Sequence, residues 1–229
     1  MKVEVFPDRD ALAAGAAEHI ASVLREAPGP RVSLGLAGGS TPEATYKQLR
    51  GLAARWERVD AWLTDERWVP EDHPDSNGRM AAEALLQHVN ATFHRPRWAT
   101  WLEPDESAAH YEATLRSLHP AAHLPDLVLL GIGSDGHTAS LFPGTAALTA
   151  DSRWYLANYV PPLEVWRLTA TIPFLTQAAQ IFFLVTGDEK AEVLSRILAG
   201  DDFPAATVAA AAKEVSWLVD EAAAAHISP

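Results

Sequence analysis

No cysteine occurs in this sequence, and that absence removes several classes of chemistry at once. Disulfide bonds, thiolate nucleophiles and cysteine-ligated zinc or iron–sulfur centres are all excluded. If the protein is an enzyme, its catalysis must use other side chains.

Long apolar runs and basic residues are also scarce. No window approaches eighteen consecutive apolar residues, and the start "MKVEVFPDRD" lacks the basic segment and apolar run of a secretory signal, so we expect a cytoplasmic protein. The formal net charge of -12 disfavours nonspecific binding to nucleic acid or to an anionic membrane. A small anionic substrate remains possible where a few cations gather.

The composition that remains is that of an ordinary globular protein, with 48% hydrophobic and 21% charged residues among 229. Residues 1–229 are therefore interpreted as a single domain, because no internal repeat, basic tail or long linker interrupts them. The sequence displays no assembly motif, and we expect a monomer.

Strand-like apolar runs alternate with helix-like segments along the chain. The expected pairs are "KVEVF" with "DRDALAAGAAEHIASVLREA", "RVSLGLAGG" with "TPEATYKQLRGLAARW", "DAWLTDERW" with a helix around 79–90, "DLVLLGIGSDG" with "HTASLF", "QIFFLVTG" with "DEKAEVLSRILAG", and "VSWLVD" with "EAAAA". This alternation predicts an α/β fold with a mostly parallel, doubly wound, Rossmann-like sheet and helices on both faces. Ligands bind such sheets beyond the carboxyl ends of the strands.

The loop "AGGSTPEATY" follows the second strand. Gly38 and Gly39 permit tight backbone geometry, and Ser40 or Thr41 is placed to cap the next helix. Amides, hydroxyls and a helix N-terminus together favour a phosphate. An ordinary capped helix, with Ser40 and Glu43 forming a capping box, is the alternative.

Two basic residues follow other strands at the same predicted edge. Arg67, next to Asp65 and Glu66, could clamp a phosphate or carboxylate, or form a surface salt bridge. Lys190 is expected in the first helical turn after Asp188, where a cation opposes the helix dipole. A bound anion would explain that placement, and pairing with a neighbouring acid is the alternative.

The stretch "DLVLLGIGSDGHTASLFPG" carries a G-x-G-x-x-G pattern typical of dinucleotide binding. Dinucleotide binding, and with it a nicotinamide dehydrogenase, requires a long helix after the glycine turn. Pro143 follows Gly136 by seven residues and leaves room for barely two helical turns, which disfavours this interpretation. A serine-hydrolase elbow centred on Ser134 fails because Ile132 stands where glycine is needed. A metal site on Asp135 and His137 lacks a third ligand in a compact motif.

What remains is His137, held in a glycine-rich turn with Asp135 two residues away. Such a histidine can accept a proton near neutral pH. Most histidines are surface or satisfied core residues, and that interpretation stays open from the residues alone.

Taken together, five segments resemble the glucosamine-6-phosphate isomerase/6-phosphogluconolactonase family, in particular its 6-phosphogluconolactonase branch. They are "LGLAGGSTPEATYKQL", residues 63–80, "DLVLLGIGSDGHTASLFPGT", "WRLTATIPFLTQA" and "VTGDEKAEVL". The resemblance implies hydrolysis of 6-phospho-D-glucono-1,5-lactone to 6-phosphogluconate, a step of the pentose phosphate pathway, with a phosphorylated sugar lactone as the small-molecule partner. It implies no metal and no organic cofactor, because a lactone is already an activated ester.

The resemblance also implies roles for individual residues. His137 is the expected general base, and Asp135 orients the imidazole or a sugar hydroxyl. The residues expected to bind the substrate and its phosphate are Gly38, Gly39, Ser40, Thr41, Asp65, Arg67, Arg167 and Lys190.

Two alternatives are weighed against this function. A glucosamine-6-phosphate deaminase typically continues its D-G-H turn toward Asn-Glu-Pro, whereas this chain reads Leu141-Phe142-Pro143, so the acid for ring opening is missing. A non-catalytic sugar-phosphate-binding regulator would be expected to carry a helix-turn-helix segment, and 229 residues at net charge -12 leave no spare basic domain.

Overall fold

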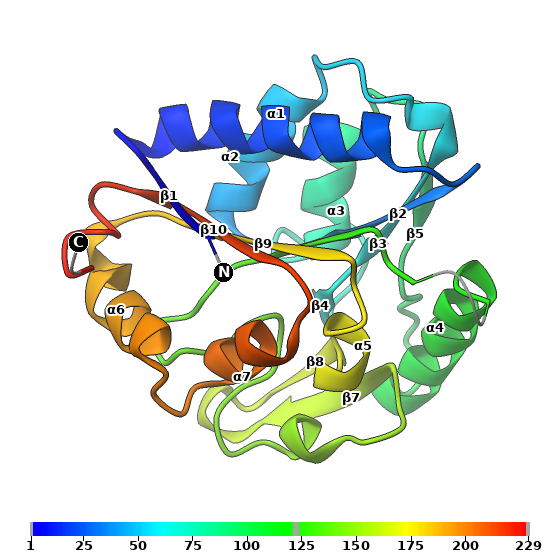
Figure 1. Ribbon diagram of the computed structural model, residues 1–229. Helices are drawn as coiled ribbons and strands as arrows, with labels where there is room; N and C mark the ends of the chain where they lie inside the picture. Colours follow the sequence, from blue (N-terminus) through cyan, green and yellow to red (C-terminus); the bar gives the residue numbers. More distant parts are fainter. Residues whose placement is uncertain (1, 121–123, 228–229) are drawn as a thin grey trace.

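A seven-stranded parallel sheet forms the centre of the computed structural model, which describes residues 2–120 and 124–227 (Figure 1). Its strands run in the order β1-β10-β9-β6-β2-β3-β5. They are β1 (Lys2–Phe6), β10 (Val215–Asp220), β9 (Gln180–Val185), β6 (Leu127–Leu130), β2 (Val32–Leu36), β3 (Val59–Leu63) and β5 (Thr92–His94). The predicted α/β class and parallel sheet are confirmed.

Helices cover both faces of this sheet, as predicted (Figure 1). One face packs against α1 (Arg9–Glu26), α2 (Ser40–Leu49), α3 (Asn77–Ala81) and the π-helical turn Ala82–Leu86. The other packs against α4 (Pro104–Leu118), α5 (Ile172–Leu175), α6 (Ala191–Ala199) and α7 (Pro204–Ala211). Among the described residues, no helix combines the length and apolar character needed to cross a membrane.

Strand β6 shows why the central strands are apolar without interruption. Leu127 and Leu129 enter the core on the side of α1, while Val128 and Leu130 enter the opposite core. Successive side chains of a strand point to opposite faces, so a strand covered on both sides is apolar throughout. Each such side chain contributes roughly 1.5–3 kcal/mol to folding when fully buried.

A second, antiparallel sheet in the order β4-β8-β7 was not predicted. It lies below the first sheet in the view of Figure 1. Its strands are β4 (Asp65–Arg67), β8 (Val165–Ala170) and β7 (Tyr155–Val160). The run "DAWLTDERW" therefore divides between two sheets: β3 ends at Leu63, and β4 pairs with β8. Residues that follow β3 are directed toward β8 in this way.

Three expected helices are wrong or too long. Residues 137–142 form no helix, because Gly136 and Ala139 have positive φ and the Gly133 amide bonds back to the His137 carbonyl. Residues 221–226 form turns, since the short run "EAAAA" makes too few hydrogen bonds to nucleate a helix. Helix α2 ends at Leu49 instead of continuing to residue 56, and a tight turn at Gly51 follows it.

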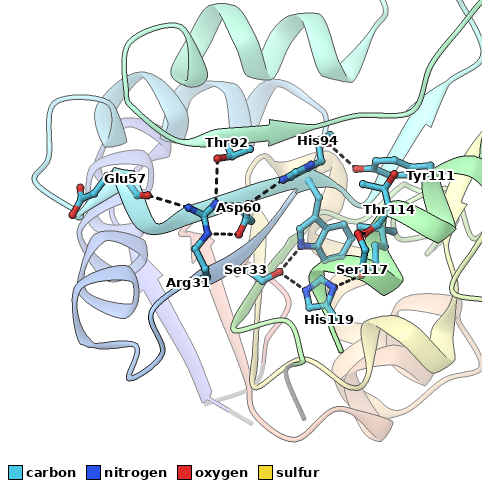
Figure 2. A network of polar contacts seen from close by, with 12 residues as sticks. Arg31, Ser33, Glu57, Asp60, Thr92, His94, Tyr111, Thr114, Ser117 and His119 are labelled. Atoms are coloured by element: carbon cyan, nitrogen blue, oxygen red, sulfur yellow. Dashed lines mark hydrogen bonds and ion pairs between the residues drawn. The ribbon is translucent and has the colours of Figure 1, made fainter. Parts of the chain in front are cut away.

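A polar network joins β3 and β5 with Arg31, which immediately precedes β2 (Figure 2). Asp60 accepts from Arg31, whose Nε lies 2.7 Å from Oδ2, and from His94 Nε2 at 3.0 Å. Burial raises the pKa of Asp60, but the hydrogen bonds from Arg31 and His94 outweigh it, and the net pKa is lowered. Figure 2 also shows the buried His119, whose Nε2 lies 2.6 Å from the Ser33 hydroxyl.

Candidate active site

Two adjoining cavities open beyond the carboxyl ends of β2, β3, β6, β9 and β10. One, of about 330 Å³, is called here the histidine chamber and is lined by residues that include Asp65, Arg67, His137, Phe142, Leu163 and Arg167. The other, of about 370 Å³, is called the loop chamber and is lined by residues that include Arg9, Ser40, Thr41, Thr186, Glu189 and Asp220. Gly38, Gly39, Gly131, Ile132 and Lys190 line both. The sequence-predicted loops therefore meet at one site.

His137 is oriented by the carboxylate two residues before it. Its Nδ1 lies 2.5 Å from Asp135 Oδ1, and its backbone amide donates to the same oxygen at 3.2 Å. An ionised carboxylate only accepts hydrogen bonds, so Nδ1 carries the proton and Nε2 keeps its lone pair. The arrangement leaves one imidazole nitrogen available as a base.

The glycines of the turn make room for this histidine. A Cβ on Gly133 would lie 2.1 Å from His137 Nδ1 and 2.6 Å from Asp135 Oδ1. Gly136 has φ +76°, and a Cβ there would lie 2.2 Å from the Phe203 ring. The G-x-G-x-x-G pattern thus serves a packed histidine turn, and no long helix follows it.

Arg67 and Arg167 lie directly opposite each other in the β4–β8 ladder. Like charges at such positions destabilise a sheet. Arg67 donates to the Asp75 carbonyl at 2.8 Å, while Arg167 Nε is buried without a hydrogen-bond partner. Neither arginine forms an ion pair with any residue that the structure describes. The predicted alternative of a surface salt bridge at Arg67 is therefore not found there.

The pKa of Arg167 reflects this environment. Burial lowers it, and the neighbouring Arg67 charge lowers it further, against the opposing effect of Asp65 and more distant acids. The net direction is below the ordinary arginine value. Two close cations, one of them partly desolvated, form a site suited to an anion.

Lys190 stands at the entrance to α6, as its N-cap, within the short 3₁₀ turn Asp188–Lys190. It borders both chambers. The expected location near the first turn is confirmed, although Lys190 precedes the α-helix proper. Within the described chain it forms no ion pair, so neither Asp188 nor Glu189 neutralises it.

The loop at the start of α2 differs from the predicted cap. Gly39, with φ +103°, is the N-cap, and Ser40 is the first helical residue. The Ser40–Glu43 capping box is therefore wrong: glycine allows the sharp entry without a side-chain cap, and Glu43 pairs with Lys47 at 2.5 Å. Thr41 contacts the Thr186 hydroxyl at 2.7 Å, which ties this loop to the loop after β9.

Asp65 is buried and held by the protein. Its carboxylate accepts from the Ser140 hydroxyl at 2.7 Å and from Asn77 Nδ2 at 3.3 Å. Asn158 in turn donates to the Ser140 carbonyl at 2.9 Å. These contacts connect the histidine turn to the loop after β3.

Glu66 holds the loop of residues 65–78 together. It accepts from the amides of Arg67, Asn77 and Gly78, each at 2.7 Å, and from the Ser76 hydroxyl at 3.0 Å. Burial raises the pKa of Glu66, while these donors oppose that rise. Glu66 is thus a structural residue of the site.

Several lining residues were missed by the sequence analysis, among them Arg9, Asn77, Phe142, Leu163 and Thr186. Arg9 follows the carboxyl end of β1, so the rule about strand ends could have found it. Asn77 follows Ser76, which caps α3. Asn77 lies close against the backbone at Gly38, where a Cβ would be 2.0 Å from Asn77 Oδ1. Leu163 belongs to the unpredicted β7–β8 hairpin. In the described part of the chain, no group of three or more His, Asp or Glu side chains is placed to hold a metal ion.

Comparison with known proteins gives a consistent result. The model of the glucosamine-6-phosphate isomerases/6-phosphogluconolactonase family matches residues 7–217. A 6-phosphogluconolactonase of Synechocystis sp. is 38% identical over 208 residues, which cover 86% of this chain and 85% of that protein.

Solved structures give the same result for the fold. The 6-phosphogluconolactonase of Trypanosoma brucei is similar with a TM-score of 0.88 and 30% identity, covering 99% of this chain and 98% of the other. A monomeric glucosamine-6-phosphate deaminase is also similar, with a TM-score of 0.83 and 27% identity over 99% of this chain and 100% of the other.

Proposed function

This chain belongs to the glucosamine-6-phosphate isomerase/6-phosphogluconolactonase family, and from that membership and the site we propose that it is a 6-phosphogluconolactonase. It hydrolyses 6-phospho-D-glucono-1,5-lactone to 6-phosphogluconate, a step of the oxidative pentose phosphate pathway. The observation that carries the proposal is that His137 lines one chamber together with Arg67 and Arg167, neither of which forms an ion pair within the described residues. Asp135 lines neither chamber but contacts His137.

We place the phosphate where the two chambers meet. Lys190 lines both, the Gly38–Thr41 loop lies on one side, and Arg67 and Arg167 lie on the other. A dianion there would neutralise the two facing arginines, which the protein leaves unpaired. The phosphate sits at the opposite end of the sugar from C1, so its binding energy can position the lactone carbonyl beside His137.

In the proposed mechanism, His137 Nε2 removes a proton from water as the water oxygen attacks C1. The tetrahedral intermediate carries an oxyanion at C1, which a hydrogen-bond donor close to C1 would stabilise. The bond from C1 to the ring oxygen then breaks, and the imidazolium returns its proton to that oxygen. The product carboxylic acid ionises in solvent.

Asp135 and Asp65 have different proposed parts in this reaction. Asp135 keeps the Nδ1 proton in place and stabilises the imidazolium. Asp65 lines the chamber with its carboxylate already held by Ser140 and Asn77, so it is positioned to accept a sugar hydroxyl.

We also propose that the protein acts as a cytoplasmic monomer without nucleic acid, metal or organic cofactor. The net charge of -12 supports the absence of a polyanionic partner. The chemistry supports the absence of a cofactor, since a base and a hydrogen-bond donor suffice for an activated ester.

The test is to generate the lactone in place from glucose 6-phosphate with its dehydrogenase and to follow lactone loss above the spontaneous rate. Wild type should be rapid, and folded His137→Ala should lose on the order of 10²–10⁴-fold in kcat. His110→Ala, which removes an exposed histidine of α4, is the matched control and should match wild type.

Wild type at the spontaneous rate would overturn the proposal, and glucosamine 6-phosphate would be tried next. Equal rates for wild type and His137→Ala would leave the reaction standing but remove His137 as the base.

A further inference from the structure

Phe142 lies against the face of the His137 imidazole. The two ring centroids are 4.0 Å apart, and the ring planes differ by 31°. Phe142 is partly buried and also lines the histidine chamber. The aromatic ring therefore contacts both the base and the space where substrate is proposed to bind.

The contacts of His137 with Asp135 and Phe142 are complementary. The hydrogen bond from Nδ1 to Asp135 lies at the edge of the imidazole, whereas Phe142 covers a face. An edge contact alone leaves the ring free to tilt about that bond, and a face contact opposes such tilting. Together they fix the direction in which Nε2 points.

The backbone of Phe142 is fixed independently of its side chain. The Thr145 amide and hydroxyl donate to the Phe142 carbonyl at 3.2 and 2.8 Å. Asn158 Nδ2 donates to the buried Thr145 hydroxyl at 3.0 Å. Changing the Phe142 side chain leaves every one of these bonds in place.

We propose that Phe142 is a positioning residue for His137, holding the imidazole for attack and stabilising the imidazolium formed when water loses its proton. The negative face of an aromatic ring attracts a cation. This attraction grows only as His137 becomes charged, so it favours the transition state over the ground state. The inference rests on the proposed function insofar as His137 is the base.

Other charged groups also act on the imidazole and must stay constant in a test. They are Asp135 on the same turn, Asp65 and Arg67 on β4, Arg167 on β8 and Lys190 at the start of α6. Phe142→Leu alters none of these charges, and it keeps an apolar side chain of similar bulk. Phe142→Tyr retains the aromatic face and serves as the conservative variant.

The experiment measures lactone hydrolysis and the histidine titration in parallel. For Phe142→Leu we expect kcat to fall on the order of tenfold with KM little changed. The imidazole titration of His137, followed by NMR and assigned by its loss in His137→Ala, should move about half a pH unit lower. The acidic limb of the kcat profile should move with it, and Phe142→Tyr should restore both.

Phe93→Leu, the same change in β5, is the control and should alter neither measurement. A Phe142→Leu enzyme with unchanged kcat and His137 titration would overturn the proposal. A change in KM alone would also overturn it, because that outcome makes Phe142 a wall of the substrate site. Because the NMR titration needs no substrate, it still decides the question if wild type proves inactive on the lactone.

Discussion

At Gly133, a hydrogen in place of a side chain lets the His137–Asp135 pair approach the backbone. A Cβ at this position would come within 2.1 Å of His137 Nδ1. We expect Gly133→Ala to displace the imidazole and to reduce kcat at least tenfold, since small misplacements of a catalytic group have large effects. Steady-state kinetics and a thermal unfolding curve would measure activity and folding separately.

Gly51→Ala is the control for that substitution, because a Cβ there would meet only the Gln48 carbonyl oxygen at an ordinary 3.6 Å. It should retain wild-type kcat. Full activity in Gly133→Ala would show that the turn can shift without moving His137 out of place.

His137 also shows the limit of sequence reasoning about single residues. Its glycine-rich turn and the nearby Asp135 were visible in sequence, and they gave the correct local contact. The packing of Phe142 on the imidazole was not visible, because a five-residue separation in an irregular loop specifies no contact distance. Regular periodicity predicts neighbours only where the backbone itself is regular.

At the scale of elements, the β4–β8 ladder sets Arg167 against Arg67. Replacing Arg167 with methionine removes one of two like charges and a buried Nε without a partner. We expect Arg167→Met to unfold at the same or a higher temperature than wild type. Its binding free energy for the phosphorylated substrate should also be weaker by roughly 1.5–3 kcal/mol, which would be measured as a higher KM.

A methionine variant that unfolds at a lower temperature, with KM unchanged, would contradict this expectation. It would show that Arg167 contributes to folding instead of to anion binding. Leu168→Met, on the same strand with its side chain buried, gives a comparison without charge change.

The pairing of β4 with β8, which places the two arginines opposite each other, could not be predicted from the sequence. Parallel strands were found because each is an apolar run followed by a loop and a helix. Strand β4 has only three residues, all charged, and its partner lies about a hundred positions along the chain. Pairing over that distance depends on the folded sheet and not on local pattern, so Arg167 could be named only through resemblance.

Asp60 gives a pH-dependent prediction at the opposite end of β3. Its pKa is lowered in the folded protein, so its contribution to stability is present above the ordinary value of 3.8 and is lost as pH falls through the folded pKa. Asp60→Asn should therefore be less stable than wild type at pH 7 by about 2 kcal/mol. Denaturant unfolding should show this gap closing below pH 3.8. A gap that stays constant across that range would exclude a charge-dependent role.

For the whole molecule, the site combines a local excess of positive charge with a net charge of -12. Surface charges farther away than the screening length of about 8 Å act weakly at physiological ionic strength. Arg67, Arg167 and Lys190 act inside the cavities, at short range. An anionic product can therefore bind a strongly acidic protein. Because it binds the folded state and not the unfolded state, its binding raises the free energy of unfolding.

Product binding should accordingly stabilise the whole chain. At a concentration of 6-phosphogluconate about 100 times its Kd, the free energy of unfolding should rise by about 2.7 kcal/mol. Gluconate at the same concentration lacks the phosphate and should stabilise far less. Thermal unfolding with each ligand measures the difference, and Arg167→Met should reduce the effect of 6-phosphogluconate without altering that of gluconate. Equal stabilisation by the two ligands would mean that the cations at the junction of the chambers do not recognise the phosphate.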